Sequence, residues 1–207
     1  CTEGDGMTLI PPSDEDHLER KSPILDILKQ LSSLLYGLAS RGPLDALRGL
    51  VDFLARLIRG APLPRYSRIT PNVYVSGQHR RRGMSILRGW GITGSVNLRS
   101  EYDDDAAGIA AANHLHLATI DNTAPTLEQI ERGVAFMRDE IARGGKVYVH
   151  CAAGVGRAPT MAAAYLVSEG LTTDEAWATI RQVRPFIRPT SEQQALVRRY
   201  AAGLSGE

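Results

Sequence analysis

The residues of this chain best suited to chemistry are Cys151 and Arg157, which lie six positions apart. Only small residues separate them, in the order Ala152, Ala153, Gly154, Val155, Gly156. Small and glycine residues let a backbone curl so that successive N–H groups point at one anion. An arginine that closes such a loop can bind two phosphate oxygens through its planar guanidinium. The spacing therefore predicts a phosphate-binding loop that begins with a cysteine.

Cys151 is a candidate nucleophile because of its surroundings. A run rich in β-branched and aromatic residues at 146–150 predicts a strand before it, and Arg157 opens an expected helix. The positive end of a helix dipole and a guanidinium both favour the thiolate. A thiolate behind a bound phosphate can attack phosphorus in line. The alternative, an inert core cysteine, leaves the arginine spacing and the glycines unexplained.

Asp121 is the candidate proton donor. It lies 30 residues before Cys151, directly after an expected strand at 114–120. The carboxyl ends of parallel strands face the same rim, so both loops can reach one crevice. Asp121 would protonate the leaving group and then activate water, although an ordinary turn at a helix entry is the alternative. A general acid argues against sulfur transfer and arsenate reduction, which also use cysteine loops.

No cofactor or metal is expected, because the loop itself supplies positive charge. The residues that bind metals in proteins show no metal-ligand spacing here. His114 and His116 alternate along one expected strand, and we interpret them as packing or solvent-facing residues.

The composition fits one domain with an appendage. The 207 residues are 43% hydrophobic and 23% charged, with a formal net charge of +1. The only cysteines, Cys1 and Cys151, exclude a disulfide framework, and a working thiolate prefers a reducing compartment. We therefore expect a cytoplasmic protein, peripheral at a membrane if it contacts one, with no nucleic acid partner. Met7 is a candidate native start, which leaves the origin of Cys1 open.

Residues 53–100 carry no acidic side chain but nine arginines. Such a stretch would attract an anionic partner. The equally weighted alternative is that these arginines pair with acidic residues elsewhere in the fold.

The first 62 residues divide into two parts. Residues 1–21 are polar and rich in turn residues, which predicts a flexible tail. Residues 22–62 predict a helical hairpin, because apolar residues recur at a spacing of three and four on both sides of Gly42-Pro43. The two stripes are Ile24, Ile27, Leu31, Leu34, Leu38 and Leu44, Leu47, Val51, Leu54, Ile58. They would pack on the catalytic domain or on a second copy, or else lie on a membrane surface.

Residues 63–207 alternate between short strands and helices. The expected strands are 72–76, 95–99, 114–120 and 146–150, and the expected helices are 84–89, 126–142, 157–169, 172–183 and one from 190. Capping boxes at Thr126, Thr172 and Thr190 mark three helix starts. The alternation predicts an α/β fold in which helices flank a mostly parallel sheet.

The string from His150 to Arg157, with Asp121 upstream, resembles the CX5R loop of the protein tyrosine phosphatase superfamily in its dual-specificity branch. The resemblance covers about residues 66–203. The segments 121–127, 133–136, 147–151 and 160–166 are similar to the mitochondrial lipid phosphatase family acting on phosphatidylglycerophosphate. That family carries an acidic–Tyr–acidic loop, which Glu101, Tyr102 and Asp103 resemble. The resemblance implies that these residues orient the substrate or Arg157; the alternative for 103–105 is a solvated acidic turn.

Ala158 departs from the family, which usually has Ser or Thr after the loop arginine to assist thiolate departure. A Gly–Arg–Ala–Pro version also resembles active glucan phosphatases of plants, so the departure concerns the rate of turnover. By the same resemblance, Gln193 or Gln194 would position the hydrolytic water.

Three functions remain in competition. The first is a phosphatase for an anionic lipid or small polyol phosphate, which the arginine-rich stretch and the amphipathic hairpin favour. The second is a phosphatase for phosphoproteins, and the depth of the pocket would separate the two. The third is a phosphate-binding scaffold without turnover, against which the joint presence of Cys151, Arg157 and Asp121 argues.

Overall fold

In this computed structural model, the structure describes residues 42–204. The expected tail at 1–21 and the first helix of the expected hairpin lie outside the described residues. The second helix of the hairpin is present as α2 (Pro43–Arg59), and Pro43 occupies its first turn as the sequence predicts.

A four-stranded sheet forms the centre of the fold. Its strands are β1 (Val73–Gly77), β2 (Ile92–Arg99), β3 (Asn113–Thr119) and β4 (Lys146–Cys151). Their order in the sheet is β1-β4-β2-β3, and all three pairings are parallel. The expected α/β architecture is therefore confirmed. The order places β4, which ends at Cys151, between two other strands, so the loop after it starts from a fixed position.

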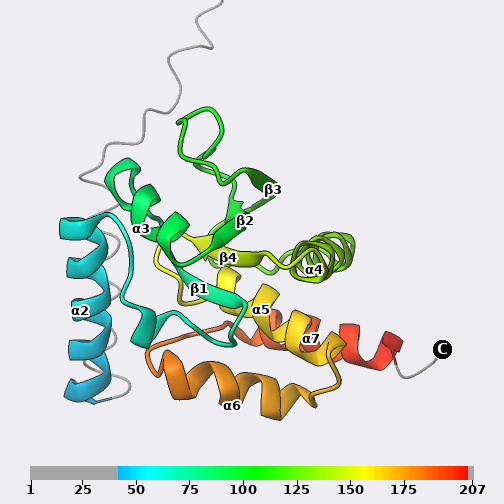
Figure 1. Cartoon of the computed structure of the whole chain (residues 1–207). Coiled ribbons are helices and arrows are strands. Elements are labelled where there is room, and N and C mark those ends of the chain that lie inside the picture. The colour runs from blue at the N-terminus through cyan, green and yellow to red at the C-terminus, as the bar shows by residue number, and fades with distance from the viewer. Residues whose placement is uncertain (1–41, 205–207) are drawn as a thin grey trace, which may run out of the picture.

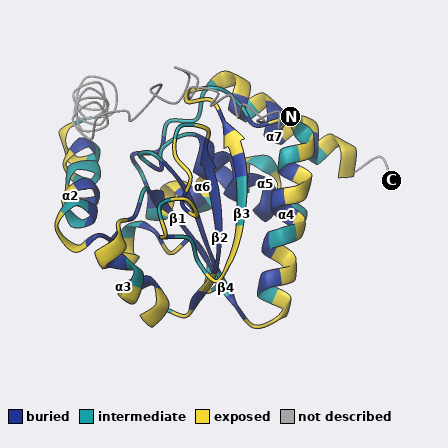
Figure 2. Cartoon of the chain, turned by 90° about the horizontal axis from the view of Figure 1, so that it is seen from above, coloured by how far each residue is buried: buried dark blue, intermediate teal, exposed yellow. Residues whose placement is uncertain are grey.

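The two faces of the sheet are covered differently (Figure 1). Alternate residues of β1 and β4, such as Val75 and Val149, join a large core cluster, whereas Tyr74 and Tyr148 join a second, smaller one. The large cluster includes residues of α4 (Leu127–Ala142), α5 (Arg157–Ser168), α6 (Thr173–Val183) and α7 (Ser191–Leu204). The smaller cluster includes α3 (Met84–Gly89). Figure 2 shows β2 and β4 in dark blue, buried between these layers, whereas β3 at the sheet edge is partly exposed.

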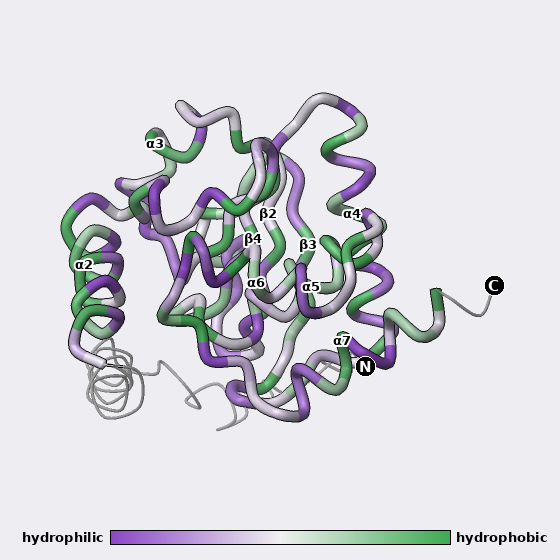
Figure 3. Tube along the Cα trace, turned by 90° about the horizontal axis from the view of Figure 1, so that it is seen from below, coloured by the Kyte–Doolittle hydropathy of each residue, from purple (hydrophilic) through white to green (hydrophobic). Residues whose placement is uncertain are grey.

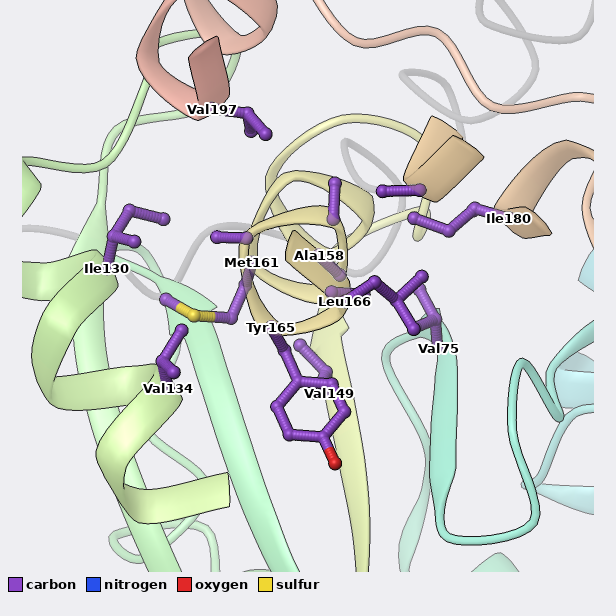
Figure 4. Packing of buried hydrophobic residues seen from close by; sticks show 14 of the residues in the cluster. Val75, Ile130, Val134, Val149, Ala158, Met161, Tyr165, Leu166, Ile180 and Val197 are labelled. Carbon is purple, nitrogen blue, oxygen red and sulfur yellow. The ribbon is translucent and has the colours of Figure 1, made fainter. Parts of the chain in front are cut away.

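α5 is the central helix of the large core. Every residue from Arg157 to Val167 is buried, and alanines make up much of its surface. Figure 4 shows Met161 of α5 pointing toward Ile130 and Val134 of α4. A Cβ at Gly133 would stand 2.5 Å from the Met161 sulfur, so this glycine lets α4 approach closely. The helix that carries Arg157 is thus enclosed by packed side chains.

The capping boxes predicted from sequence are present. Thr126 accepts from the Gln129 N–H while the Gln129 side chain accepts from the Thr126 N–H, and Thr172 with Glu175 forms the same exchange. Thr190 and Gln193 repeat it at the start of α7. These boxes define three helix starts, because each one satisfies two otherwise unpaired backbone donors.

α2 lies beside the β1 edge of the sheet, on the opposite side of the molecule from α4 (Figures 1 and 3). Its apolar stripe is exposed: the fractions are 57% at Leu44, 54% at Leu47, 37% at Val51, 40% at Leu54 and 69% at Ile58. The helix instead buries Ala46, Asp52, Phe53 and Arg56. α2 therefore packs on the catalytic domain, as one alternative for the hairpin expects, but it does so through a face that includes buried charged residues and not through the apolar stripe. Within the described residues, no helix is long and apolar enough to cross a membrane.

Candidate active site

The loop from Cys151 to Arg157 connects the end of β4 to the start of α5. Cys151 is buried, with 3% of its surface exposed, and its Sγ accepts a hydrogen bond of 3.3 Å from the Gly154 N–H. The strand–loop–helix context expected from the sequence is present. Cys151 therefore lies at the N-terminal end of a buried helix, where the helix dipole favours an anion.

The carbonyl groups of the loop bond outward. Ala152 O accepts from the Gln78 N–H at 3.0 Å, Val155 O accepts from the Arg188 N–H at 2.6 Å, and Gly156 O accepts from the Thr160 N–H at 3.0 Å. Since the chain has no cis peptide among its described residues, each following N–H points away from its bonded carbonyl. This arrangement turns the N–H groups of Ala153, Gly156 and Arg157 away from the partners of these carbonyls, the direction that anion binding in the loop requires.

Gly154 is the residue that the loop geometry needs most. Its φ of 71° lies in the left-handed region. A Cβ at this position would also overlap the backbone of Ser76 and Gly77. Glycine satisfies both conditions at once, so this position of the loop does not tolerate a side chain.

Arg157 is 1% exposed and is held by several acceptors. Glu101 binds Nη1 and Nη2 at 2.9 and 3.0 Å, and Asp121 contacts Nη2 at 2.9 Å. The carbonyls of Leu98 and Thr119 accept from Nη1 at 3.2 and 2.8 Å. Burial would lower the pKa of Arg157, but the bonds to Glu101 and the charges of Cys151 and Asp121 raise it above its ordinary value. The Nε atom, by contrast, is buried without a hydrogen-bond partner among the described residues.

Glu101 sits between two arginines. Besides Arg157, it binds Arg99 Nε at 2.9 Å. Burial acts to raise the pKa of Glu101, but the hydrogen bonds and charge of Arg157, helped by Arg99, lower it to about 2. Tyr102 lies 5.0 Å from the Arg99 guanidinium at its ring centroid, and the Asn97 side chain donates to its carbonyl. Glu101 thus contacts Arg157 directly, whereas Tyr102 packs on Arg99.

The arginines of the basic stretch at 53–100 fall into a buried group and an exposed group. Arg56 and Arg99 are buried and pair with Asp52 and Glu101. Others are exposed on the surface: Arg59, Arg65, Arg68, Arg80, Arg81, Arg82, Arg88. The pairing interpretation therefore holds for Arg56 and Arg99, whereas an anionic partner for the exposed arginines stays a prediction.

Asp121 follows β3 in an exposed turn, and 45% of its side chain is accessible. The residue after it, Asn122, has a φ of 63°, which turns the chain sharply before α4. Gln193 of α7 donates to the Thr123 carbonyl at 2.8 Å and is fully buried. A Cβ on Gly156 would lie 3.1 Å from the Gln193 side chain. Gln193 therefore touches both the acid-bearing turn and the phosphate loop.

Two further residues singled out in the sequence, Gln194 and Ala158, make contacts outside the phosphate loop. Gln194 turns to the Pro189 carbonyl at 3.2 Å. Ala158 is fully buried in the core cluster. The nearest hydroxyl along the helix belongs to Thr160, which donates to the Gly156 carbonyl at 2.9 Å.

A second polar cluster, which spacing along the sequence did not reveal, lies behind the loop. His150 Nε2 contacts Asp104 Oδ2 at 2.7 Å, and the rings of His79 and His150 lie 5.2 Å apart. Their three potential metal ligands lie within 4.8 Å of one another. His79 Nε2 already bonds the Ile109 carbonyl at 2.7 Å. The bond from His79 has the distance of a hydrogen bond, and the His150–Asp104 contact is an ion-pair distance. The cluster thus joins the segments of His79 and Asp104 to the residue preceding Cys151.

The surroundings of this cluster lower the pKa values of His79 and Asp104. Burial and the neighbouring His150 lower the pKa of His79 to about 4, against the opposing effects of Asp104 and Ile109 O. Burial acts to raise the pKa of Asp104, but its contacts with His150, His79 and Gln78 lower it.

The comparison with protein families decides the classification. Residues 73–202 match the model described as dual specificity phosphatase, catalytic domain. The chain belongs to this family. The match begins at β1 and ends within α7, so α2 precedes it.

Known proteins give the same classification. The chain is 30% identical to the human "Phosphatidylglycerophosphatase and protein-tyrosine phosphatase 1" over 132 residues, covering 59% of this chain and 66% of that protein. It is 31% identical over 120 residues to "Phosphatidylglycerophosphate phosphatase PTPMT1" of Arabidopsis thaliana, covering 55% and 36%. A third relative, "Dual specificity protein phosphatase 5" of Homo sapiens, is 29% identical over 126 residues, covering 58% and 32%. The chain thus spans less than two thirds of the length of these relatives.

Solved structures share the fold. The crystal structure of PTPMT1 superposes with a TM-score of 0.60 at 27% identity, covering 68% of this chain and 96% of that one. The structure of Tk-PTP in its active form gives 0.60 at 27% identity, covering 67% and 97%. The dual-specificity phosphatase family and the cysteine-phosphatase fold, both expected from the loop motif, are confirmed.

Proposed function

We propose that this protein hydrolyses phosphate monoesters through a phosphocysteine on Cys151, with an anionic lipid or small polyol phosphate as its substrate. The observation that carries the proposal is the hydrogen bonding of the Arg157 guanidinium. Glu101 takes one edge of the guanidinium, Nε has no partner among the described residues, and Asp121 holds the shared Nη2. An incoming phosphate would bond Nε and replace Asp121 at Nη2, which satisfies the buried donor.

That exchange prepares both catalytic groups. Asp121 leaves Arg157 as the phosphate arrives, takes up a proton from solvent once the guanidinium no longer neutralises its charge, and faces the leaving group as a carboxylic acid. The Cys151 thiolate attacks phosphorus, the P–O bond to the alcohol breaks, and the departing oxygen takes the proton of Asp121. The loop N–H groups and Arg157 stabilise the charge on the transferred phosphoryl group.

The second step regenerates the enzyme. Water attacks phosphorus and gives a proton to the Asp121 carboxylate, the S–P bond breaks, and inorganic phosphate leaves the Cys151 thiolate. Gln193, which touches both loops, is the residue that would orient this water. Ala158 offers no hydroxyl for thiolate departure, so we expect this step to limit the rate.

The lipid assignment is supported by the surface of α2 together with the similarity to proteins named phosphatidylglycerophosphate phosphatases. The exposed apolar stripe of α2 ends near exposed arginines at Arg59 and at the 3-10 helix η3 (Arg81–Gly83). Apolar side chains bordered by positive charge suit an anionic bilayer surface. Peripheral contact with such a membrane is part of the proposal.

The test is phosphate release from a matched panel of substrates. It compares phosphatidylglycerophosphate in vesicles, monophosphorylated inositol lipids and a phosphotyrosine peptide. The proposal expects the lipids to have the higher kcat/KM, and Leu54→Glu on the stripe to lower activity on vesicles while leaving a water-soluble aryl phosphate unaffected. A higher value for the peptide would favour a phosphoprotein phosphatase. Phosphate binding without release from any substrate would favour a scaffold.

A further inference from the structure

The phosphate loop is contacted from behind by a buried cluster of three charges. Asp52 of α2 is 1% exposed, Arg56 of α2 is 5% exposed, and Arg184, just after α6, is 0% exposed. Asp52 Oδ2 lies 3.2 Å from Arg56 Nε and 3.4 Å from Arg184 Nη2. One carboxylate oxygen therefore bridges two guanidiniums that are 128 positions apart in the chain, Arg56 and Arg184.

Each of these two guanidiniums also donates a hydrogen bond to a backbone carbonyl of the phosphate loop. Arg184 Nε donates to Gly154 O at 3.2 Å. Arg56 Nη1 reaches Ala152 O at 3.5 Å. The packing here is tight, since a Cβ on Gly77 would lie 2.6 Å from Ala152 O and would overlap the Arg56 side chain. The cluster thus contacts the loop at two of its peptide groups.

These contacts act on the face of the loop that does not meet the phosphate. Holding the Ala152 and Gly154 carbonyls outward turns the N–H groups of Ala153 and Val155 inward, because a trans peptide opposes the two directions. A positive charge at a carbonyl also polarises the peptide so that its N–H becomes a better donor. The cluster carries two positive charges and one negative, so it adds net positive charge behind an anion site.

We infer that Asp52 and Arg56 of α2 are positioning residues for the phosphate loop. α2 precedes residues 73–202, which match the family model, so this chain supplies its own support for the loop from outside that domain. Asp52 acts through Arg56 and Arg184, and neither α2 residue touches the phosphate. The inference rests on the proposed function only in taking the loop as a phosphate site.

The experiment compares the buried pair with a surface pair on the same helix. Asp52→Asn and Arg56→Met disrupt the cluster. Asp45→Asn and Arg48→Met disrupt a matched ion pair of 2.8 Å whose side chains are 26% and 38% exposed. The first readout is the dissociation constant for inorganic phosphate by calorimetry, well below the melting temperature of each variant. The second is hydrogen exchange of the backbone amides at 152–157.

We expect Asp52→Asn and Arg56→Met to weaken phosphate binding by about tenfold to about a hundredfold, the effect of losing a buried charge-assisted hydrogen bond. We also expect faster exchange of the loop amides in these two variants, while the surface variants match the wild type. Unchanged phosphate affinity and loop exchange in variants that merely melt earlier would overturn the inference. Failure of turnover in the wild type would count against the proposed function alone, because the exchange readout needs no substrate.

Discussion

Glu101 binds Arg157 with both of its carboxylate oxygens, at 2.9 and 3.0 Å, and so fixes the position of the guanidinium. A bidentate pair of this kind restrains the guanidinium plane as well as its position. In the proposed mechanism the phosphate bonds Nε and Nη2, and the Glu101 pair would orient these two nitrogens before a substrate arrives. We therefore propose that Glu101 contributes to substrate binding by holding the guanidinium in place.

Glu101→Gln should lower kcat/KM by about tenfold or more, because an amide has only one acceptor oxygen and would place its NH2 against one of the guanidinium nitrogens. Steady-state kinetics with a soluble aryl phosphate measures this. Asp105→Asn, at an exposed acidic residue of the same turn, is the control and should match the wild type. Equal kinetics for Glu101→Gln and the wild type would show that Arg157 is oriented without this carboxylate.

The same residue gives a pH prediction for stability. The folded-state pKa of Glu101 is lowered to about 2 from 4.5. A lowered carboxyl pKa contributes stability that is fully present above the unfolded pKa and is lost as the pH falls toward the folded one. The stability difference between wild type and Glu101→Gln should therefore be constant above about pH 4.5 and shrink between that pH and about 2. Denaturant unfolding across this range measures it, and a difference that stays constant would contradict the lowered pKa.

Cys151→Ser should abolish turnover while preserving phosphate binding, since the loop N–H groups and Arg157 remain. Phosphate release and calorimetry on the same protein check the two halves. Cys1→Ser, at the only other cysteine, is the control and should retain activity. Retained activity in Cys151→Ser would rule out a phosphocysteine mechanism.

Asp121→Asn should slow the hydrolysis of alkyl phosphates by about a hundredfold or more, the usual contribution of a general acid. Aryl phosphates with good leaving groups need little protonation and should slow much less. A plot of rate against leaving-group basicity measures the contrast, with Glu128→Gln at the exposed start of α4 as the control. The same loss for all leaving groups would remove Asp121 from the role of general acid.

His79 predicts a loss of stability in mild acid. Its pKa is lowered to about 4 by burial and by His150, while Asp104 opposes the shift and the Tyr148 ring packs against it. The unfolded chain therefore binds more protons than the folded one between about pH 6.5 and 4, so stability falls as the pH drops through this window, by about 3 kcal/mol in total.

His79→Gln should remove that slope, because a glutamine amide can keep the bond to Ile109 O without titrating. The variant should be less stable than the wild type at pH 7, and the gap should narrow toward pH 4.5. Chemical denaturation at several pH values measures it. His114→Gln, at an exposed histidine of β3, is the matched control and should follow the wild-type profile. A gap independent of pH would show that His79 does not titrate in this window.

The fold was largely predictable from local signals. Capping boxes and the 3-4 periodicity defined helix starts, and β-branched runs defined strands. The start of β2 was missed, since it begins at Ile92 and not at 95. Gly94 interrupts the pattern there, and the structure explains why this position is a glycine: a Cβ on Gly94 would lie 2.7 Å from the Glu140 side chain. A close approach between distant elements has no local sequence signature.

The sequence predicted those site residues that lie in one local motif or directly after a predicted strand. Cys151, Arg157 and the turn with Asp121 fall in that class. The Asp52–Arg184 contact and the His79–Asp104–His150 cluster join segments far apart in the chain, so neither leaves a spacing to recognise. The amphipathic rule also gave no sign that α2 buries Asp52 and Arg56, because it counts apolar residues and cannot register two charges that have specific partners.

The enclosure of α5 by packed side chains also bears on how this protein would lose activity on heating. Arg157 opens a helix whose every residue through Val167 is buried, so the guanidinium cannot shift unless the surrounding helices separate. An active site on a peripheral loop can fail by local fraying long before the molecule unfolds. Here thermal inactivation and global unfolding should coincide, so substitutions deep in the core, far from any substrate, would lower the temperature of inactivation and the melting temperature together.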